Sequence, residues 1–275
     1  MPITLGSAGL QIINLFDTMI YMRRLELGLG WSVEMAENLK GVYNYQQTIF
    51  ALPCAFIPTI TIACIPAITA ALTRRELDNV RATEESAIRT MALVAMPCAA
   101  GLFAMAEPVI RLLCTSYTPE QLAVATKMLM ILGVAVIFNS LVLLFNAFMQ
   151  AHGDVTSPVI NMFIGGIVKI AVNYIVVGIP EINIVGAPVG TLVCYVVITV
   201  LNYFALRRCV KGNLPIFRNL IRPLIASAIM GVGASKSIKR VNWSIAKSML
   251  LAWVITFPAC GVIGFVLAKL FMLFA

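Results

Sequence analysis

Two side chains are the clear cases of charge deep inside the long apolar segments of this 275-residue sequence, and they are the first candidates for chemistry. Asp17 lies in the first apolar segment and Lys169 in the fifth. A charged group at membrane depth is costly and usually marks a working site. Asn173 lies one helical turn after Lys169 on the same helix face, and Thr191 adds a hydroxyl group early in the next segment. We therefore predict an intramembrane polar site formed by Asp17, Lys169, Asn173 and Thr191.

The depths of the two charges are compatible with an ion pair across a helix bundle. Asp17 precedes the headgroup-level Arg23 by six residues, or about 9 Å of helix, and Lys169 precedes Gly178 by nine residues, or about 13 Å. Two interpretations remain open at this point. The pair could change during a transport cycle, with the ammonium group standing where other carriers hold Na⁺ or H⁺. It could equally be static and fix the helix register, or each side chain could reach water separately.

Other polar residues in the apolar segments also allow a functional and a structural interpretation. They could line a hydrophilic cavity, but interhelical hydrogen bonds or an interfacial aromatic belt explain them equally well. Three prolines in the second segment predict helix kinks, because proline removes a backbone hydrogen bond, and broken helices line cavities in transporters. The polar residues are Tyr43, Tyr45, Gln46, Gln47, Asn139 and Asn146, and the prolines are Pro53, Pro58 and Pro66.

The elements that position these residues are apolar runs long enough to cross a bilayer. A span needs about 20 apolar residues, and helices satisfy their own backbone in lipid. Hydrophobic residues make up 60% of the chain and charged residues 12%, against about 25% charged in soluble domains. We predict an all-α integral membrane protein of about eight transmembrane helices, the seventh being short. The spans are Pro2–Met22, Tyr43–Leu72, Ile88–Met105, Leu122–Met149, Pro158–Gly178, Ile184–Leu206, Leu220–Ala234 and Met249–Phe274.

Charge and motif content favour lipid partners over nucleic acid and transport over catalysis. The net charge is +8, but the basic residues lie mostly in short loops beside lipid headgroups. They divide almost evenly between the two sides and so do not predict orientation. The charged segment Thr73–Ser86 is helix-prone and is expected along the membrane surface, and His152 has no evident partner that would make it a base or a ligand. Phosphate-binding loops, paired cysteines and paired carboxylates are absent, so we expect no enzyme, no metal site and no cofactor.

The order of several segments resembles a known transporter family. A glycine turn is followed by a proline-started helix with Lys and Asn, and then by a Gly-Ala-x-x-x-Thr helix entry. This order resembles flippases for polysaccharides and lipid-linked oligosaccharides in the multidrug/oligosaccharidyl-lipid/polysaccharide exporter superfamily, and most of all the stage V sporulation protein B branch, which is similar to the lipid II flippases. The segments are Phe56–Ala71, Arg74–Glu76, Phe148–Pro158, Gly165–Asn173 and Ile184–Thr191.

The resemblance implies a fold of two six-helix lobes, to which some branches add two C-terminal helices. This chain would match the second lobe over residues 1–207 and the extra pair over residues 208–275. The first lobe would then come from outside this sequence or from a separate polypeptide. Relatives with a cation site build it from the helices that match spans one, five and six, where Asp17, Lys169, Asn173 and Thr191 fall. The lysine departs from a simple Na⁺ cage.

The function implied by the resemblance is alternating-access flipping of a lipid-linked polysaccharide or peptidoglycan precursor in the plasma membrane. Peptidoglycan-precursor flippases carry basic residues on the helix that matches span two, but Tyr43–Leu72 has no Lys or Arg. A pyrophosphate clamp would therefore come from the other lobe, or the substrate differs. A drug/cation antiporter of the same superfamily is the alternative, and a membrane glycan polymerase or ligase is the alternative from another class. An isolated lobe is expected to be inactive unless it pairs.

Overall fold

The structure is a computed structural model, and it describes residues 2–28, 30–210, 220, 221, 223 and 225. Over these residues the chain is helical and has no strand. The prediction of an all-α fold is therefore confirmed for the described part. Its α-helices are α1 Pro2–Arg23, α2 Val33–Cys54, α3 Ile57–Thr73, α4 Leu77–Ala104, α5 Ala106–Leu113, α6 Pro119–Ala151, α7 Thr156–Val176 and α8 Gly186–Cys209. Two short helices, η1 Arg24–Gly28 and η2 Asn183–Val185, follow α1 and precede α8.

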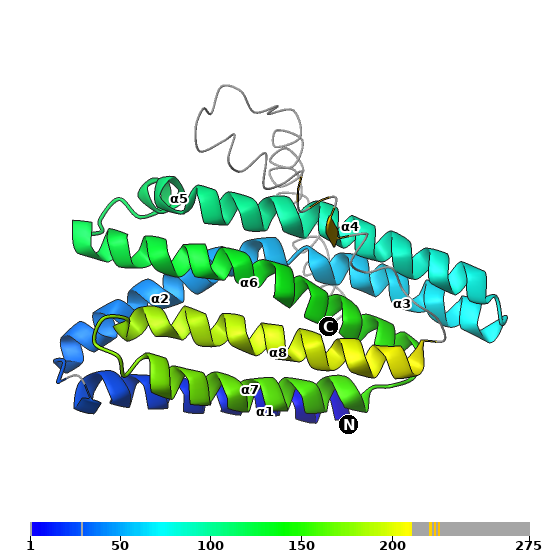
Figure 1. Cartoon of the computed structure of the whole chain (residues 1–275), viewed down its shortest axis with the longest axis horizontal. Coiled ribbons are helices and arrows are strands. Elements are labelled where there is room, and N and C mark those ends of the chain that lie inside the picture. Colours follow the sequence, from blue (N-terminus) through cyan, green and yellow to red (C-terminus); the bar gives the residue numbers. More distant parts are fainter. Residues whose placement is uncertain (1, 29, 211–219, 222, 224, 226–275) are drawn as a thin grey trace, which may run out of the picture. The chain divides into compact units, whose positions relative to one another are not determined.

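Helix α6 is the centre of the packing, with α2, α3, α4, α5 and α8 against it (Figure 1). Its start is fixed by a capping box, in which Thr118 and Gln121 exchange backbone and side-chain hydrogen bonds. Gly133 of α6 lets α4 approach closely, because a side chain there would meet the backbone of Ala99 and Phe103. Small residues at helix crossings allow this kind of close contact between membrane helices.

Helix α7 packs between α1 and α8, and two adjacent glycines explain how. A methyl group on Gly165 would collide with Ile198 of α8, and one on Gly166 would collide with Ile13 of α1. Successive contacts along α1 and α7 pair residues of increasing number, so the two helices run in the same direction (Figure 1). This parallel arrangement carries the intramembrane polar site.

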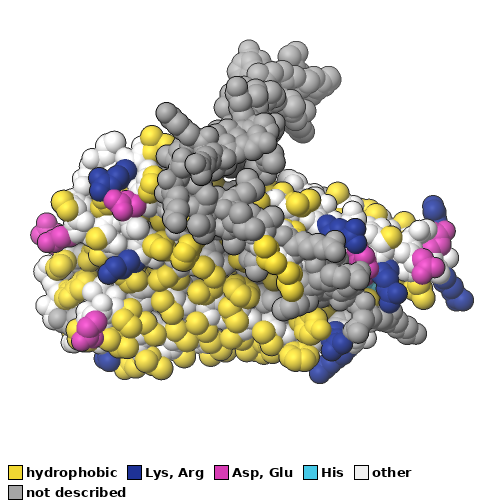
Figure 2. Space-filling view, turned by 45° about the horizontal axis from the view of Figure 1, so that its top comes forward, with side chains coloured by type: hydrophobic (Ala, Val, Ile, Leu, Met, Phe, Trp, Pro, Cys, Tyr) yellow, Lys and Arg dark blue, Asp and Glu magenta, His cyan; other side chains and the backbone are white. Residues whose placement is uncertain are grey.

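Five helical segments of the described residues are long and apolar enough to cross a membrane. On the face drawn in Figure 2, charged side chains gather toward two ends of the helices and hydrophobic side chains fill the region between them. Helix α1 matches the predicted first span to within a residue at its end, but its membrane crossing stays a prediction. Of the spans Leu220–Ala234 and Met249–Phe274 the structure describes only residues 220, 221, 223 and 225, and of the predicted domain 208–275 it describes these and residues 208–210, so both stay predictions. The five segments are Val33–Thr73, Leu77–Ala104, Pro119–Ala151, Thr156–Val176 and Asn183–Cys209.

The second span is interrupted beside two of its three prolines, and one expectation about the segment after it needs correction. The span is broken at Ala55 and Phe56, so Pro53 lies in the last turn of α2 and Pro58 in the first turn of α3. Pro66 lies inside α3, which continues past it to Thr73. Most side chains of Thr73–Ser86 are exposed, and its helix-prone composition is confirmed from Leu77 on, but not all of the segment lies on the surface. Helix α4 already begins at Leu77, and its early residues Val80, Glu84 and Ala87 are buried against the protein.

Candidate functional site

The structure places Asp17 and Lys169 in contact at the interface of α1 and α7. The Lys169 ammonium nitrogen lies 3.0 Å from Asp17 Oδ2, and the two side chains are 13% and 3% exposed. The Asn173 side-chain amide donates to the other carboxylate oxygen at 2.6 Å. Both oxygens of Asp17 therefore have partners from α7. Charge-assisted bonds of this kind are the stronger hydrogen bonds in proteins.

The register of the parallel helices explains why these side chains meet. The contact of Ile13 with Gly166 sets the two helices close together, and one turn further on Asp17 faces Lys169. Asn14 adds a fourth group, because Lys169 Nζ donates to its side-chain oxygen at 3.5 Å. The sequence prediction missed Asn14. Its spacing of three residues before Asp17, which puts both on one helix face, was the available signal.

Thr191 belongs to a neighbouring pair and not to the ion pair itself. Its hydroxyl lies 3.0 Å from the Tyr43 hydroxyl and also donates to the Ala187 carbonyl at 3.2 Å. The Tyr43–Thr191 bond joins α2 to α8, and both side chains are buried. The ring of Tyr21, on α1, packs edge-on against Tyr43 with centroids 6.2 Å apart. The predicted four-residue site is thus two adjacent hydrogen-bonded groups on four helices.

Gly190 of α8 makes room for the amide that holds Asp17. A methyl group there would overlap the side-chain oxygen of Asn173. We predict that Gly190→Ala displaces Asn173 from Asp17 and lowers the free energy of unfolding by about 1–3 kcal/mol, the usual cost of overpacking. Thermal unfolding in detergent measures this. Gly101→Ala is the matched control, because nothing lies within 4 Å of its added methyl group. Equal unfolding temperatures for both variants would contradict the assigned packing.

Three buried asparagines form a second polar chain through the bundle. Asn161 of α7 donates to Asn202 of α8 at 2.9 Å, and Asn202 donates to Asn146 of α6 at 2.8 Å. Such amide bonds hold membrane helices in register. Asn146 was singled out from the sequence as a cavity residue, whereas Asn161 and Asn202 were missed. In the structure these groups bond to one another across a helix interface.

The remaining cavity candidates are spread over different places. Asn139 bonds to the Cys54 thiol between α6 and α2. Tyr45 is exposed and donates to the Leu113 carbonyl at 3.4 Å. Gln46 is fully buried, and neither atom of its amide has a hydrogen-bond partner, while Gln47 is half-buried. The structure does not gather them with Asn146 into one group.

The expectation that His152 has no partner is wrong. His152 Nε2 lies 2.8 Å from Glu84 Oε1, and the Glu84 side chain is completely buried. The pair ties α4 to the turn that follows α6. It was missed because Glu84 was assigned to a surface loop, whereas α4 turns that residue inward. The second carboxyl oxygen, Oε2, is buried without a hydrogen-bond partner.

Asp154 closes the same turn and starts α7. Its Oδ1 accepts from the backbone N–H groups of Ser157 at 3.0 Å and Thr156 at 3.2 Å. Burial raises the pKa of this carboxyl, but hydrogen bonds from Ser157, Thr156 and Cys209 outweigh it, so that the pKa lies below its ordinary value. Asp154, one residue before the N-cap position of α7, therefore places a negative charge at the N-terminus of that helix at neutral pH.

No group of three or more His, Cys, Asp and Glu side chains within the described residues is arranged to hold a metal ion. Near the ion pair, the side chains with oxygen atoms that could coordinate a cation are those of Asp17, Asn14 and Asn173. The side-chain oxygen of Asn173 is buried and has no hydrogen-bond partner. The cation that Asp17 contacts in the structure is the ammonium group of Lys169.

Comparison with known proteins gives consistent results over nearly the whole chain. It is 26% identical over 262 residues to the uncharacterized membrane protein YabM of Bacillus subtilis (strain 168), covering 95% of this chain and 45% of that protein. It is 21% identical to stage V sporulation protein B of the same organism, covering 91% and 50%. The chain therefore spans about half the length of these curated relatives. A stretch of 41 residues is also 54% identical to part of a probable low-affinity inorganic phosphate transporter of that organism.

The fold and the family agree. A solved structure of the lipid II flippase MurJ in an inward closed conformation matches with a TM-score of 0.66 and 14% identity, covering 90% of this chain and 50% of that one. The family model described as lipid II flippase MurJ matches residues 1–254. Together with the long apolar helices, this match makes the protein a multi-pass protein of the plasma membrane. The chain belongs to the MurJ family of lipid II flippases.

Proposed function

We propose that this chain is one lobe of a flippase that moves a lipid-linked peptidoglycan precursor across the plasma membrane by alternating access. The observation that carries the proposal is the buried Asp17–Lys169 pair between α1 and α7, in a chain of the lipid II flippase family. Ionisable groups inside a membrane bundle are retained where a transport pathway needs them. The family match favours a lipid-linked substrate over the drug/cation antiporter and over a glycan polymerase or ligase.

The pair is suited to a two-state change. Its two charges lie on different helices and hold α1 to α7 with few other polar contacts, so separating these helices exposes both charges together. The free-energy cost of separating the two charges falls when each charge meets water or substrate in an opened cavity. A conformational change of this kind requires a group with two alternative sets of partners. Asn14 lies three residues before Asp17 on α1, and Asn173 lies four residues after Lys169 on α7, so each charge keeps an amide one turn away on its own helix when the two helices separate.

The Asp17–Lys169 pair also bears on whether Na⁺ drives transport. Lys169 Nζ already neutralises Asp17 at 3.0 Å, so a bound Na⁺ is not needed for that purpose. We expect that replacing Na⁺ by choline leaves the flipping rate of the wild-type chain, paired with its complementary lobe, unchanged. In a Lys169→Met variant, Asp17 is left for an external cation, and flipping by that variant should become dependent on Na⁺ or on low pH.

The test uses bacterial cells depleted of their own lipid-linked precursor flippase. This chain is expressed alone, and also together with the half of stage V sporulation protein B that it does not match. The chain alone should not restore growth, because alternating access needs two lobes, and the two parts together should restore it. If the two parts together do not restore growth although both are present in the membrane, the proposal is contradicted.

A further inference from the structure

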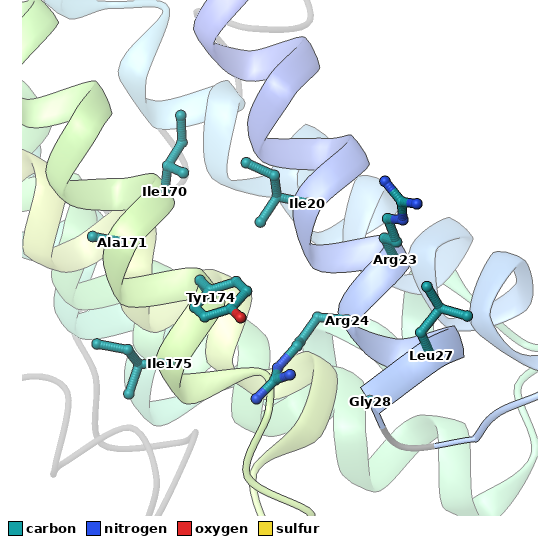
Figure 3. A pocket seen from close by; sticks show the side chains of 9 residues that line it. All are labelled: Ile20, Arg23, Arg24, Leu27, Gly28, Ile170, Ala171, Tyr174 and Ile175. Carbon is teal, nitrogen blue, oxygen red and sulfur yellow. The ribbon is translucent and has the colours of Figure 1, made fainter.

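A groove of about 590 Å³ lies where α1 ends beside α7. Its walls are apolar along the helices, with Ile20 on one side and Ile170 and Ala171 on the other (Figure 3). Two arginines, Arg23 and Arg24, line its end, where α1 gives way to η1. The groove therefore joins an apolar channel to a doubly charged end.

The Arg24 side chain is held in position by its neighbours. Its guanidinium carbon lies 4.8 Å from the centre of the Tyr174 ring, a cation–π contact. A methyl group on Gly178 would come within 2.6 Å of Arg24 Nε, so the side chain lies directly on that glycine. Figure 3 shows Arg24 beneath Tyr174, whereas Arg23 leaves the helix end in another direction. The orientation of Arg24 is thus set before any ligand arrives.

Neither arginine has an acidic partner. All twelve Asp and Glu residues of the chain lie among the residues that the structure describes, and none of the ion pairs found there involves Arg23 or Arg24. Arg24 Nε is buried without a hydrogen-bond partner. A buried donor that makes no hydrogen bond costs free energy. The planar guanidinium group matches the geometry of phosphate oxygens.

The groove opens outward, and its two arginines lie at the helix end that the sequence predicts at headgroup level. Tyr174 and Ile175 are 52% and 65% exposed, and Leu27 is 75% exposed. A ligand here would lay an apolar tail along Ile20 and Ile170 and place an anion at the arginines. We propose that the groove binds one anionic phospholipid, whose phosphodiester contacts Arg24 and whose acyl chain follows the α1–α7 groove. This site is separate from the Asp17–Lys169 pair and does not depend on the proposed flipping activity.

The test is native mass spectrometry of the full chain in mild detergent, titrated with phosphatidylglycerol and, separately, with phosphatidylcholine. We expect one tightly bound phosphatidylglycerol. Arg24→Gln should weaken that binding about five-fold, and Arg23→Gln/Arg24→Gln by a further factor of about five, from the attraction between each basic residue and an anionic lipid. Lys40→Gln, a basic residue near the start of α2 that does not line the groove, is the charge-matched control and should have no effect.

A second variant tests the apolar part of the groove without changing its charge. Ala171→Trp should fill the channel and weaken phosphatidylglycerol binding at least as much as Arg24→Gln does. Unfolding temperatures of all variants are measured in parallel, and Ala171 is exposed, so the fold should be retained. Inorganic phosphate should not compete with the lipid, because it lacks the tail.

Several results would overturn the proposal. Equal affinity for the two lipids, or unchanged binding in the double arginine variant, would show that the arginines do not select an anion. Competition by inorganic phosphate at millimolar concentration would show that the apolar groove plays no part. A dimer of this chain that forms in place of the lipid complex, and is lost in the same variants, would assign the groove to a second copy.

Discussion

Asp17→Asn should lower the free energy of unfolding by about 3–5 kcal/mol, the usual cost of removing one partner from a buried ion pair. The substitution leaves the Lys169 ammonium buried beside an amide, with the weaker Asn14 contact at 3.5 Å as its remaining described partner. Unfolding in detergent by heat or by added denaturing surfactant measures the change. Lys169→Met should cost less, because Asn173 still donates to the remaining carboxylate.

Two further variants separate the loss of pairing from other effects. Asp17→Asn/Lys169→Met removes both charges and should return the stability to within about 1 kcal/mol of the wild type, since replacing a whole buried pair is often neutral. Glu107→Gln disrupts an exposed pair at 2.7 Å and should cost less than about 1 kcal/mol. A double variant as unstable as Asp17→Asn alone would contradict the pairing.

The second large effect is expected at the other polar pair. His152→Ala should lower the free energy of unfolding by roughly 3 kcal/mol, because it leaves the fully buried Glu84 carboxyl with neither oxygen bonded. Glu84→Gln keeps an acceptor for the imidazole and should cost about 1 kcal/mol. The same unfolding measurement applies.

The control for this pair is a double variant. Glu84→Leu/His152→Leu removes both polar groups and should recover most of the stability lost in His152→Ala. If His152→Ala unfolds like the wild type, Glu84 does not depend on His152, and α4 is held at this end by its apolar contacts.

The sequence predicted the helices and the main charge pair for the same physical reason. Apolar length indicates a span, and a charge inside a span is rare enough to stand out, so Asp17 and Lys169 were identified together with their similar depths. Asn173 followed from its helical spacing. The structure adds the parallel register of α1 and α7, which the glycine pair Gly165 and Gly166 makes possible.

What the sequence did not indicate depends on which helix face looks inward. In a membrane helix both faces are apolar, so hydrophobic periodicity does not single out the buried face. Asn161 and Asn202 are therefore not singled out by the sequence, although they bond to each other. Glu84 lies in a charged stretch that resembles a surface loop. Only the packing of α4 against α6 shows that it is buried.

The central claim to test is that the Asp17–Lys169 pair takes part in the transport cycle and is not merely structural. The direct measurement is flipping of a fluorescent lipid-linked precursor in proteoliposomes by the Asp17→Asn/Lys169→Met double variant, reconstituted with the complementary lobe. The account predicts near wild-type stability with at least ten-fold slower flipping. Wild-type flipping by this stable, uncharged variant would contradict it and would leave the pair as a fixed contact between α1 and α7.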